Sequence, residues 1–307
     1  MGEAVPTSAC VCASNQCNNG LKSTSGGKLI LTSFSVKFWG TRGSVATPGP
    51  STLRCGGNTP CVEVRCGSRV IVLDAGTGIR QLGASLEQQG VTELDLLMSH
   101  FHMDHIQGFP FFTPSYRRGV RIDIHLAQFG PNRAIEEPFY KLMDQPHFPV
   151  PFEVLAADIR FHQINGACQL GDVQVRSHPV NHPGGCISYR LEYRGKSLVY
   201  MTDHEPYADS PQENAVRQFA SDADLLIREA QYTAAEYQGK RGWGHGTFDG
   251  AVTDAIQSGA KRLALFHHDP EHSDEFLESQ LSDLQSRYQS SPVDICLARE
   301  GQSIELA

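Results

Sequence analysis

The sequence predicts an α/β protein in which two β-sheets pack face to face and helices cover their outer surfaces. Three observations lead to this prediction. Short runs of β-branched and aromatic residues recur from residue 34 to residue 297. Amphipathic helical patterns lie between several of these runs. The two kinds of segment mix without the strict alternation of a parallel βαβ protein.

The first strand is expected at Phe34–Trp39, where apolar and polar residues alternate. Thr247 and Ser273 can cap the helices that begin beside them. Further strands are expected at Cys61–Val64, Val70–Leu73, Leu94–Ser99, Ile122–Leu126, Val173–His178, Ser188–Tyr193, Ser197–Met201, Leu225–Glu229, Leu263–Phe266 and Val293–Leu297. Helices are expected at Ile79–Gln89, Gln212–Ala220, Thr247–Ser258 and Ser273–Tyr288.

Residues 1–33 are expected to form a flexible N-terminal extension, because they are rich in small polar residues and poor in hydrophobic ones. This extension holds Cys10, Cys12 and Cys17. No two cysteines of the chain have the C-x-x-C spacing of a structural zinc site. We therefore interpret them as free thiols in a reducing cytoplasm, with a metal or redox role for the three as the alternative.

The formal net charge of −8 argues against a protein that binds long nucleic acids nonspecifically, because such proteins present a broad basic face. A small anionic substrate held through metal ions is compatible with this charge. No apolar run is long enough to predict a membrane span. The N-terminus has no basic region followed by an apolar core. We expect a cytoplasmic protein without membrane contact.

Four side chains that can bind metal ions follow the apolar run Leu94–Met98 within a few residues, in the sequence S-H-F-H-M-D-H. On a turn that leaves a strand, His100 and His102 can converge on one ion. Asp104 and His105 can then face a second ion as a helix begins. Imidazole and carboxylate ligands suit zinc, manganese or iron.

This H-x-H-x-D-H motif resembles the signature of the metallo-β-lactamase superfamily. The resemblance runs from Val36 to Asp274, and it is similar to the phosphodiesterase-type branch that includes ribonuclease Z and the cyclic phosphodiesterase of the carbon–phosphorus lyase pathway. It implies a four-layer αββα sandwich over residues 34–307 and two divalent metal ions, with zinc preferred and manganese as the alternative. The matching segments are Phe38–Ser44, Gly56–Cys61, Leu73–Gly78 and Leu265–Pro270.

The resemblance also implies the remaining metal ligands. His182 in V-N-H-P resembles the third histidine motif and is preferred over His178, because Gly184-Gly185 and the next strand follow it. Asp203 resembles the carboxylate that bridges both metals, and His267 resembles the last ligand. One ion would take His100, His102, His182 and Asp203, and the other would take Asp104, His105, Asp203 and His267.

Three further residues near these motifs are interpreted as supporting groups. His204 and His268 directly follow proposed ligands, so each is expected to point to the other side of its backbone. Asp74 follows a strand, and the resemblance implies that it orients a metal-binding histidine through hydrogen bonds. A carboxylate that caps the Gly76–Gly78 turn is the alternative for Asp74.

A second motif bears on the substrate. Trp243–Thr247 resembles the His-Ser-Thr segment of ribonuclease Z, and Arg228–Tyr232 resembles its His-Glu-Ala-Thr segment. Carried over, Glu229 would hold His245 in the correct tautomer, and His245 would contact the substrate. The sequence departs from the pattern at Gly246, where a Ser is common. A Gly-His-Gly turn that caps a helix is the alternative.

These features predict a dinuclear metal-dependent hydrolase that cleaves a small phosphodiester, such as a cyclic nucleotide. In this hypothesis a hydroxide that bridges the metal ions attacks phosphorus, and His245 assists departure of the alkoxide. The catalytic residues would be Asp104, His245 and Glu229. The chain lacks the long basic, Gly-rich arm with which ribonuclease Z grips transfer RNA, so a long nucleic acid is not expected. A homodimer is a family-level expectation.

Other functions are compatible with parts of the pattern. The alternative hydrolase would act on a lactone, ester or thioester, although the His245–Glu229 pair favours phosphorus. The full ligand set argues against a non-enzymatic binding module. A redox diiron role is disfavoured by His102, because those relatives have Glu there. The aromatic segment Phe139–Pro149 is either a cover over the site or ordinary packing. The basic stretch Tyr116–Arg121 is favoured as a solvated strand edge rather than a phosphate attractor.

Overall fold

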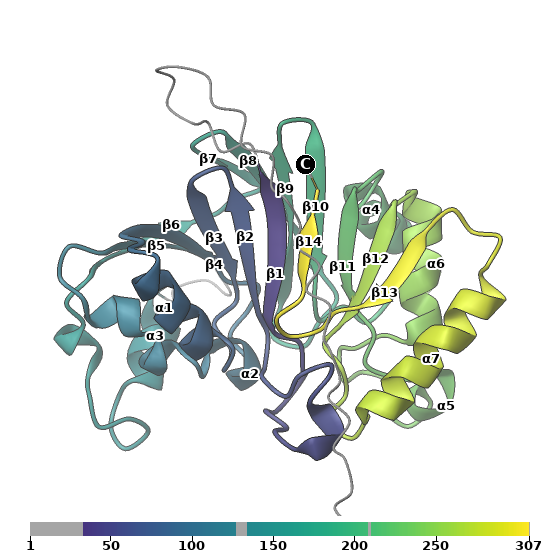
Figure 1. The fold of residues 1–307 in the computed structure, drawn as a ribbon, viewed down its shortest axis with the longest axis horizontal. Coiled ribbons are helices and arrows are strands. Elements are labelled where there is room, and N and C mark those ends of the chain that lie inside the picture. The colour runs from purple at the N-terminus through teal and green to yellow at the C-terminus, as the bar shows by residue number, and fades with distance from the viewer. Residues whose placement is uncertain (1–32, 127–133, 208–209, 307) are drawn as a thin grey trace, which may run out of the picture. The chain divides into compact units, whose positions relative to one another are not determined.

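The computed structural model describes residues 33–126, 134–207 and 210–306. Two mixed seven-stranded sheets pack face to face, and helices lie on the outer surface of each (Figure 1). The predicted four-layer αββα sandwich is confirmed. The predicted N-terminal extension, apart from Ser33, lies outside the described residues, as do its three cysteines.

The first sheet has the strand order β14-β1-β2-β3-β4-β5-β6. Its strands pair antiparallel from β14 to β3 and in parallel from β3 to β6. They span Phe34–Gly40 (β1), Cys61–Cys66 (β2), Arg69–Leu73 (β3), Glu93–Leu97 (β4), Arg121–Leu126 (β5), Asp158–Gln163 (β6) and Ser303–Glu305 (β14).

The second sheet has the order β13-β12-β11-β10-β9-β8-β7. Its pairs are parallel from β13 to β10 and antiparallel from β10 to β7. The strands span Ala167–Leu170 (β7), Val173–Val180 (β8), Cys186–Tyr193 (β9), Lys196–Met201 (β10), Leu225–Glu229 (β11), Arg262–Phe266 (β12) and Asp294–Leu297 (β13).

Helices cover the outer faces because each presents an apolar stripe to a sheet. Side chains of α1 and α3 pack with the first sheet, and those of α4, α6 and α7 pack with the second. The expected caps are confirmed, since Thr247 accepts from Gly250 N and Ser273 from Phe276 N. The helices span Ile79–Gln88 (α1), Met103–Ile106 (α2), Glu137–Leu142 (α3), Pro211–Phe219 (α4), Ala234–Tyr237 (α5), Phe248–Ser258 (α6) and Asp274–Arg287 (α7).

The core between the sheets is built from the inward-facing residues of both, because side chains alternate along a strand. Phe38 of the first sheet and Phe266 of the second are fully buried, with ring centroids 6.1 Å apart. The Tyr200 hydroxyl of the second sheet donates to Asp74 Oδ2 of the first at 2.8 Å. The core therefore fixes the two sheets relative to each other close to Asp74.

The parallel strands bring the predicted site residues to one edge of the sandwich. Asp74 follows β3 and His100 follows β4 in the first sheet, while Asp203 follows β10 and His267 follows β12 in the second. Carboxyl ends of parallel neighbours lie at the same edge of a sheet. The site is therefore assembled where these ends of the two sheets meet.

Some elements were not predicted from the sequence. Strands β6, β7 and β14 and the short helices α3 and α5 belong to this group. β6 lies at the edge of its sheet, and all of its residues are exposed or half-buried. An edge strand of this kind lacks the hydrophobic alternation by which a half-buried strand is identified.

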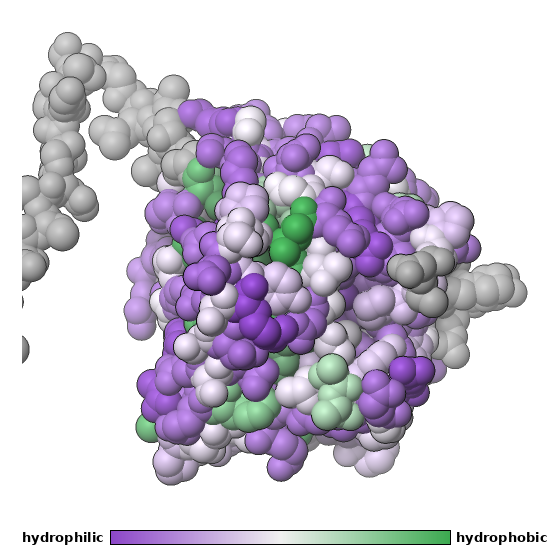
Figure 2. Space-filling view, turned by 90° about the vertical axis from the view of Figure 1, so that its right-hand side faces the viewer, coloured by the Kyte–Doolittle hydropathy of each residue, from purple (hydrophilic) through white to green (hydrophobic). Residues whose placement is uncertain are grey.

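The surface over the helices of the second sheet is largely hydrophilic, with small scattered apolar areas (Figure 2). This is the expected outer side of amphipathic helices. Among the described residues, no helix combines the length and the apolar character that crossing a membrane requires.

Replacing Phe38 with Ala is expected to lower the free energy of unfolding by about 3–5 kcal/mol, because it leaves a cavity between the sheets. Urea denaturation followed by circular dichroism would measure the change. Ile256→Ala, at a residue 38% exposed on α6, is the control and should change stability by only about 0.5 kcal/mol. Equal effects of the two substitutions would contradict this account of the core.

Candidate metal centre

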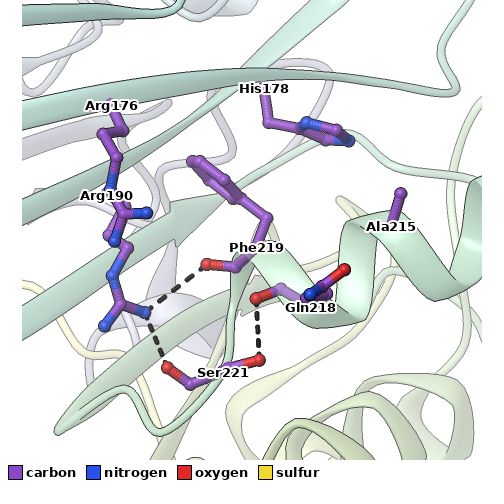
Figure 3. Close-up of a pocket in the computed structure, with 7 residues that line it drawn as sticks. All are labelled: Arg176, His178, Arg190, Ala215, Gln218, Phe219 and Ser221. Carbon is purple, nitrogen blue, oxygen red and sulfur yellow. Dashed lines mark hydrogen bonds between the residues drawn. The ribbon is translucent and has the colours of Figure 1, made fainter.

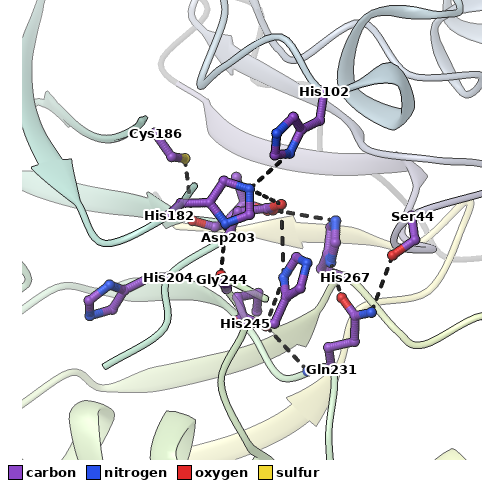
Figure 4. Close-up of polar contacts among 12 residues, drawn as sticks. Ser44, His102, His182, Cys186, Asp203, His204, Gln231, Gly244, His245 and His267 are labelled. Atoms are coloured by element: carbon purple, nitrogen blue, oxygen red, sulfur yellow. Dashed lines mark hydrogen bonds and ion pairs between the residues drawn. The ribbon is translucent and has the colours of Figure 1, made fainter. Parts of the chain in front are cut away.

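The predicted ligands lie together at the junction of the two sheets, as Figure 4 shows for those from the second sheet and for His102. The ligand atoms of His100, His102, His182 and Asp203 all lie within 4.8 Å of one another. Those of Asp104, His105 and His267 form a second group by the same measure. The structure thus brings together all seven residues that the sequence indicated, in the two predicted sets.

The first group is contributed by both sheets. His182 Nε2 lies 2.9 Å from His102 Nδ1 and 3.6 Å from Asp203 Oδ2. His100 Nε2 lies 3.5 Å from the same Asp203 oxygen. Three imidazole nitrogens and one carboxylate oxygen therefore face a common point.

The second group adjoins the first through Asp203. His105 Nε2 and His267 Nε2 are 3.2 Å apart, and Asp104 Oδ2 is 3.3 Å from the former and 3.1 Å from the latter. Asp203 Oδ1 lies 3.3 Å from each of these nitrogens. Asp203 therefore directs one oxygen to each group, which is the arrangement that a ligand shared by two ions needs.

Outer hydrogen bonds set the tautomers of two histidines from the second sheet. His182 Nδ1 lies 2.8 Å from the Gly244 carbonyl, and His267 Nδ1 lies 3.0 Å from Gln231 Oε1. Both partners are oxygens that only accept, so each Nδ1 carries the proton. The Nε2 atoms consequently point into the site, as metal ligation requires.

The same logic holds for two histidines from the first sheet. His105 Nδ1 lies 2.8 Å from Asp74 Oδ2 and donates to it. Ser99 donates its hydroxyl hydrogen to Asp74 at 2.7 Å, so its oxygen accepts from His100 Nδ1 at 3.0 Å. Asp74 therefore orients His105 directly and His100 through Ser99, in agreement with the orienting role inferred for it.

The site has the electrostatics of a cation-binding centre. Burial alone would raise the pKa of Asp203, but His267, His105 and His100 lower it well below its ordinary value. Burial lowers the pKa of His105, yet the carboxylates of Asp203, Asp104 and Asp74 outweigh it and raise that pKa well above normal. The negative charge of the buried carboxylates thus favours protonated imidazoles, and a metal cation would neutralise the same negative charge.

One buried nitrogen supports this fit directly. His100 Nε2 is buried and has no hydrogen-bond partner among the described residues. Burial lowers the pKa of His100 well below its ordinary value, so this nitrogen is an unprotonated lone pair. A buried lone pair without a partner is costly, and a metal ion would supply one. The imidazole and carboxylate donor set suits zinc or manganese.

His245 and Glu229 lie near each other in this structure, but no hydrogen bond joins them. His245 Nδ1 lies 4.0 Å from Glu229 Oε2 and 3.9 Å from Asp203 Oδ2, and it has no hydrogen-bond partner among the described residues. Glu229 instead accepts from the Arg228 guanidinium at 3.0 Å and from Gly246 N. The compact turn at Gly246 places the backbone N–H, rather than the imidazole, against the carboxylate.

His245 nevertheless faces the site. One of its nitrogens lies within 4.8 Å of ligand atoms of Asp203 and His267. Burial lowers the pKa of His245 to about 4, although Asp203 and Glu229 oppose this effect. Thr247 also caps α6, so the turn has the capping role proposed as the alternative.

Glu205 holds the loop that carries His245. Its Oε1 accepts from Gly242 N and from the Tyr237 hydroxyl, and its Oε2 accepts from Gly244 N, each at 2.8 Å. Because the Gly244 carbonyl in turn accepts from His182, Glu205 supports a proposed metal ligand through the loop backbone. No sequence motif predicted this carboxylate, although its position two residues after Asp203 is a signal that could have found it.

Ser44 and Gln231 form a second unpredicted support. Ser44 N donates to Asp104 Oδ2 at 2.7 Å, and the Gln231 amide donates to Ser44 Oγ at 3.2 Å (Figure 4). The amide oxygen of Gln231, Oε1, accepts a hydrogen bond from His267 Nδ1. Ser44 therefore links a proposed ligand of the first sheet to one of the second.

The backbone is strained at this edge. Asp74, Asp203 and His267 have φ values of 61°, 44° and 57°, and Ser44 has a φ of 63°. This left-handed conformation costs a non-glycine residue about 1–3 kcal/mol. At Gly43, an added Cβ would lie 2.4 Å from His267 Nδ1, so only glycine allows this close approach.

The other candidate histidines lie outside the centre. His204 contacts Glu213 at 3.2 Å and accepts from Asn181 N, and His268 Nε2 donates to the Ala298 carbonyl at 2.9 Å. His178 stacks on Phe219 in a separate pocket of about 510 Å³ (Figure 3). The preference for His182 over His178 therefore agrees with the geometry.

The remaining segments are explained by packing and pairing. Phe139 is fully buried and packs against Phe109 with a centroid distance of 4.7 Å, which favours ordinary packing over a cover at this residue. In the basic stretch, Arg121 lies 3.0 Å from Asp123 and Arg117 lies 3.9 Å from Glu87. These pairings fit a solvated strand edge.

Comparison with known proteins adds independent findings. A model of the beta-lactamase superfamily domain matches residues 69–268. The chain is similar to the ribonuclease Z of Picrophilus torridus, with 23% identity over 80% of this chain and 89% of that protein.

Among solved structures, the metallo-β-lactamase fold protein YhfI from Bacillus subtilis has a TM-score of 0.67 at 19% identity, covering 89% of this chain and 99% of that one. A diphosphatase from the PhnP family has a TM-score of 0.63 at 19% identity, covering 89% and 98%.

Replacing Gln231 with Ala is expected to weaken zinc affinity by about 10- to 100-fold, because His267 loses the partner that fixes its tautomer. Competition with a chromophoric chelator would measure the affinity. Gln81→Ala, at an exposed position of α1, is the matched control and should bind zinc like the wild type. Unchanged affinity in Gln231→Ala would show that His267 needs no such support.

Proposed function

The chain belongs to the β-lactamase superfamily, and from this premise we propose that it is a phosphodiesterase whose site holds two divalent metal ions side by side. It is a metal-dependent hydrolase. The observation that carries the proposal is the placement of Asp203, which directs its two oxygens to two adjoining groups of histidine nitrogens. Zinc is the metal proposed, with manganese as the alternative.

The proposed ligand sets follow the two groups. Bound divalent cations would lower the pKa of water and neutralise the charge that develops on phosphoryl oxygens. The residues of the chain would hold the metal ions and orient the substrate. Asp203 would contact both ions, and His100, His102 and His182 would complete one set. The other set would be completed by Asp104, His105 and His267.

His245 would serve the leaving group. Its imidazole lies beside Asp203 and Glu229, both of which favour its protonated form, whereas burial disfavours it. A bound diester is an anion and would raise the proton affinity of the imidazole, against burial and the charge of the bound cations. His245 can then give a proton to the departing alkoxide. Glu229 acts through its charge at 4.0 Å rather than through a hydrogen bond.

Two observations bear on the size of the substrate. The net charge of −8 supports a small diester such as a cyclic nucleotide, since a long nucleic acid requires a basic face. The similarity to ribonuclease Z favours RNA as the second candidate substrate. A cytoplasmic location is proposed, in line with the free thiols of the described cysteines.

A substrate panel tests the proposal. Zinc-loaded and manganese-loaded protein should hydrolyse bis(p-nitrophenyl) phosphate and a cyclic nucleotide, with much slower turnover of precursor transfer RNA and of lactones. Asp104→Ala and His182→Ala should abolish diester turnover while the far-ultraviolet circular dichroism stays unchanged. Full turnover by these variants would refute the site. Lactone hydrolysis without diester hydrolysis would establish the carbon-centred alternative.

His245→Ala should lower kcat/KM for a cyclic nucleotide by about 10²–10⁴-fold, because an alkoxide leaving group needs a proton. The effect on bis(p-nitrophenyl) phosphate should be much smaller, since p-nitrophenolate leaves without protonation. Zinc content should remain at the wild-type level. His178→Ala is the matched control and should retain both activities. Equal losses on the two substrates would exclude proton donation to the leaving group.

A further inference from the structure

Trp243 is a large apolar side chain that the structure holds in solvent. It is 61% exposed, although it directly precedes the buried residues Gly244 and His245. A single exposed hydrophobic residue on a mobile loop would need no explanation. Trp243 differs because its backbone is fixed on both sides.

The fixation comes from one carboxylate. Gly242 N donates to Glu205 Oε1 and Gly244 N donates to Glu205 Oε2, each at 2.8 Å. The two glycines have φ values of 82° and 91°, a left-handed conformation that side-chain-bearing residues rarely adopt. Trp243 therefore lies at the apex of a tight turn whose two flanking peptide groups are bound to the same side chain.

This apex adjoins the metal centre. The Gly244 carbonyl accepts from His182 Nδ1 at 2.8 Å, and a Cβ at Gly244 would lie 2.2 Å from that nitrogen. The residue after Gly244 is His245, which faces Asp203. The backbone of Trp243 is thus one residue away from direct contact with a proposed ligand.

Two other exposed apolar residues flank the same centre. Met103 is 60% exposed and lies between His102 and Asp104 in the chain. Val45 is 54% exposed and follows Ser44, whose N–H donates to Asp104. Segments far apart in the sequence therefore each carry an exposed apolar residue directly beside, in the chain, a residue that forms or supports the proposed centre.

We infer that Trp243 is a specificity-determining residue that stacks on a flat ring of the substrate, so that the preferred diesters carry a nucleobase. This inference rests on the proposed phosphodiesterase function. An indole ring offers a π-face to any base without reading its edges, so the preference is for base-bearing diesters as a class. The metal centre would hold the phosphate, and Met103 and Val45 would extend the apolar rim.

Product binding tests the inference without relying on turnover. The chain has two tryptophans, Trp39 and Trp243. In zinc-loaded protein, isothermal titration calorimetry should show AMP binding about tenfold more tightly than ribose 5-phosphate, which lacks the base, and AMP should quench wild-type tryptophan fluorescence. Trp243→Ala should remove this difference, and Trp243→Phe should retain most of it. Ile256→Ala, on the outer side of α6, should behave like the wild type.

A comparison of kcat/KM values provides a second test of the inference. Trp243→Ala should lower kcat/KM for 2′,3′-cyclic AMP by about tenfold and change it by less than about twofold for the corresponding base-free ribose cyclic phosphate. Equal affinities of the wild type for AMP and ribose 5-phosphate, or an AMP preference that survives in Trp243→Ala, would overturn the inference. An AMP preference without hydrolysis of any diester would instead overturn the proposed function and leave the stacking role supported.

Discussion

The carboxylate of Asp203 lies between two groups of imidazole nitrogens and is only 1% exposed. A charge buried this deeply must be matched by positive charge, since the cost of removing it from water is several kcal/mol. In the protein alone, protons on neighbouring histidines meet part of this need, as the raised pKa values of His105 and His267 indicate. The requirement for cations is thus built into the fold at this one residue.

The position of Asp203 depends on the packing of the two sheets. It follows β10 of the second sheet, while the H-x-H-x-D-H turn follows β4 of the first. A direct hydrogen bond joins the two sides at this edge, and a second one extends it within the first sheet. Tyr200 of β10 donates to Asp74, and Asp74 accepts from His105. The buried aromatic residues between the sheets therefore set the geometry of the site as well as the stability of the fold. Left-handed backbone at Asp74, Asp203 and His267 is tolerated because this surrounding packing fixes it.

The loop that carries His245 joins the catalytic and binding roles proposed above. Its inner side supports His182 through a carbonyl, and its apex holds Trp243 in solvent. Glu205 accepts hydrogen bonds from the backbone on both sides of this apex, and it lies two residues after Asp203 in the chain. A substrate would accordingly meet a charged centre lined by ligands and an apolar rim beside it. Such a division suits the proposed substrate, a molecule with an anionic diester and a flat ring.

The sequence by itself determined the sandwich and the proposed ligands. Most strands were predicted from local patterns, whereas the edge strands β6, β7 and β14 were not. The H-x-H-x-D-H motif places four proposed ligands within six residues. His182, Asp203 and His267 were identified by the resemblance of their segments to superfamily motifs, each of which follows a strand. The tertiary structure alone decided how these side chains are held. Ser44 and Gln231 meet across 187 positions of the chain, and Trp39 reaches Glu63 across 24. Contacts of this kind follow from sheet order and loop conformation, which no local pattern encodes. The same reason explains the 4.0 Å gap between His245 and Glu229, because the turn at Gly246 gives that carboxylate a backbone partner instead.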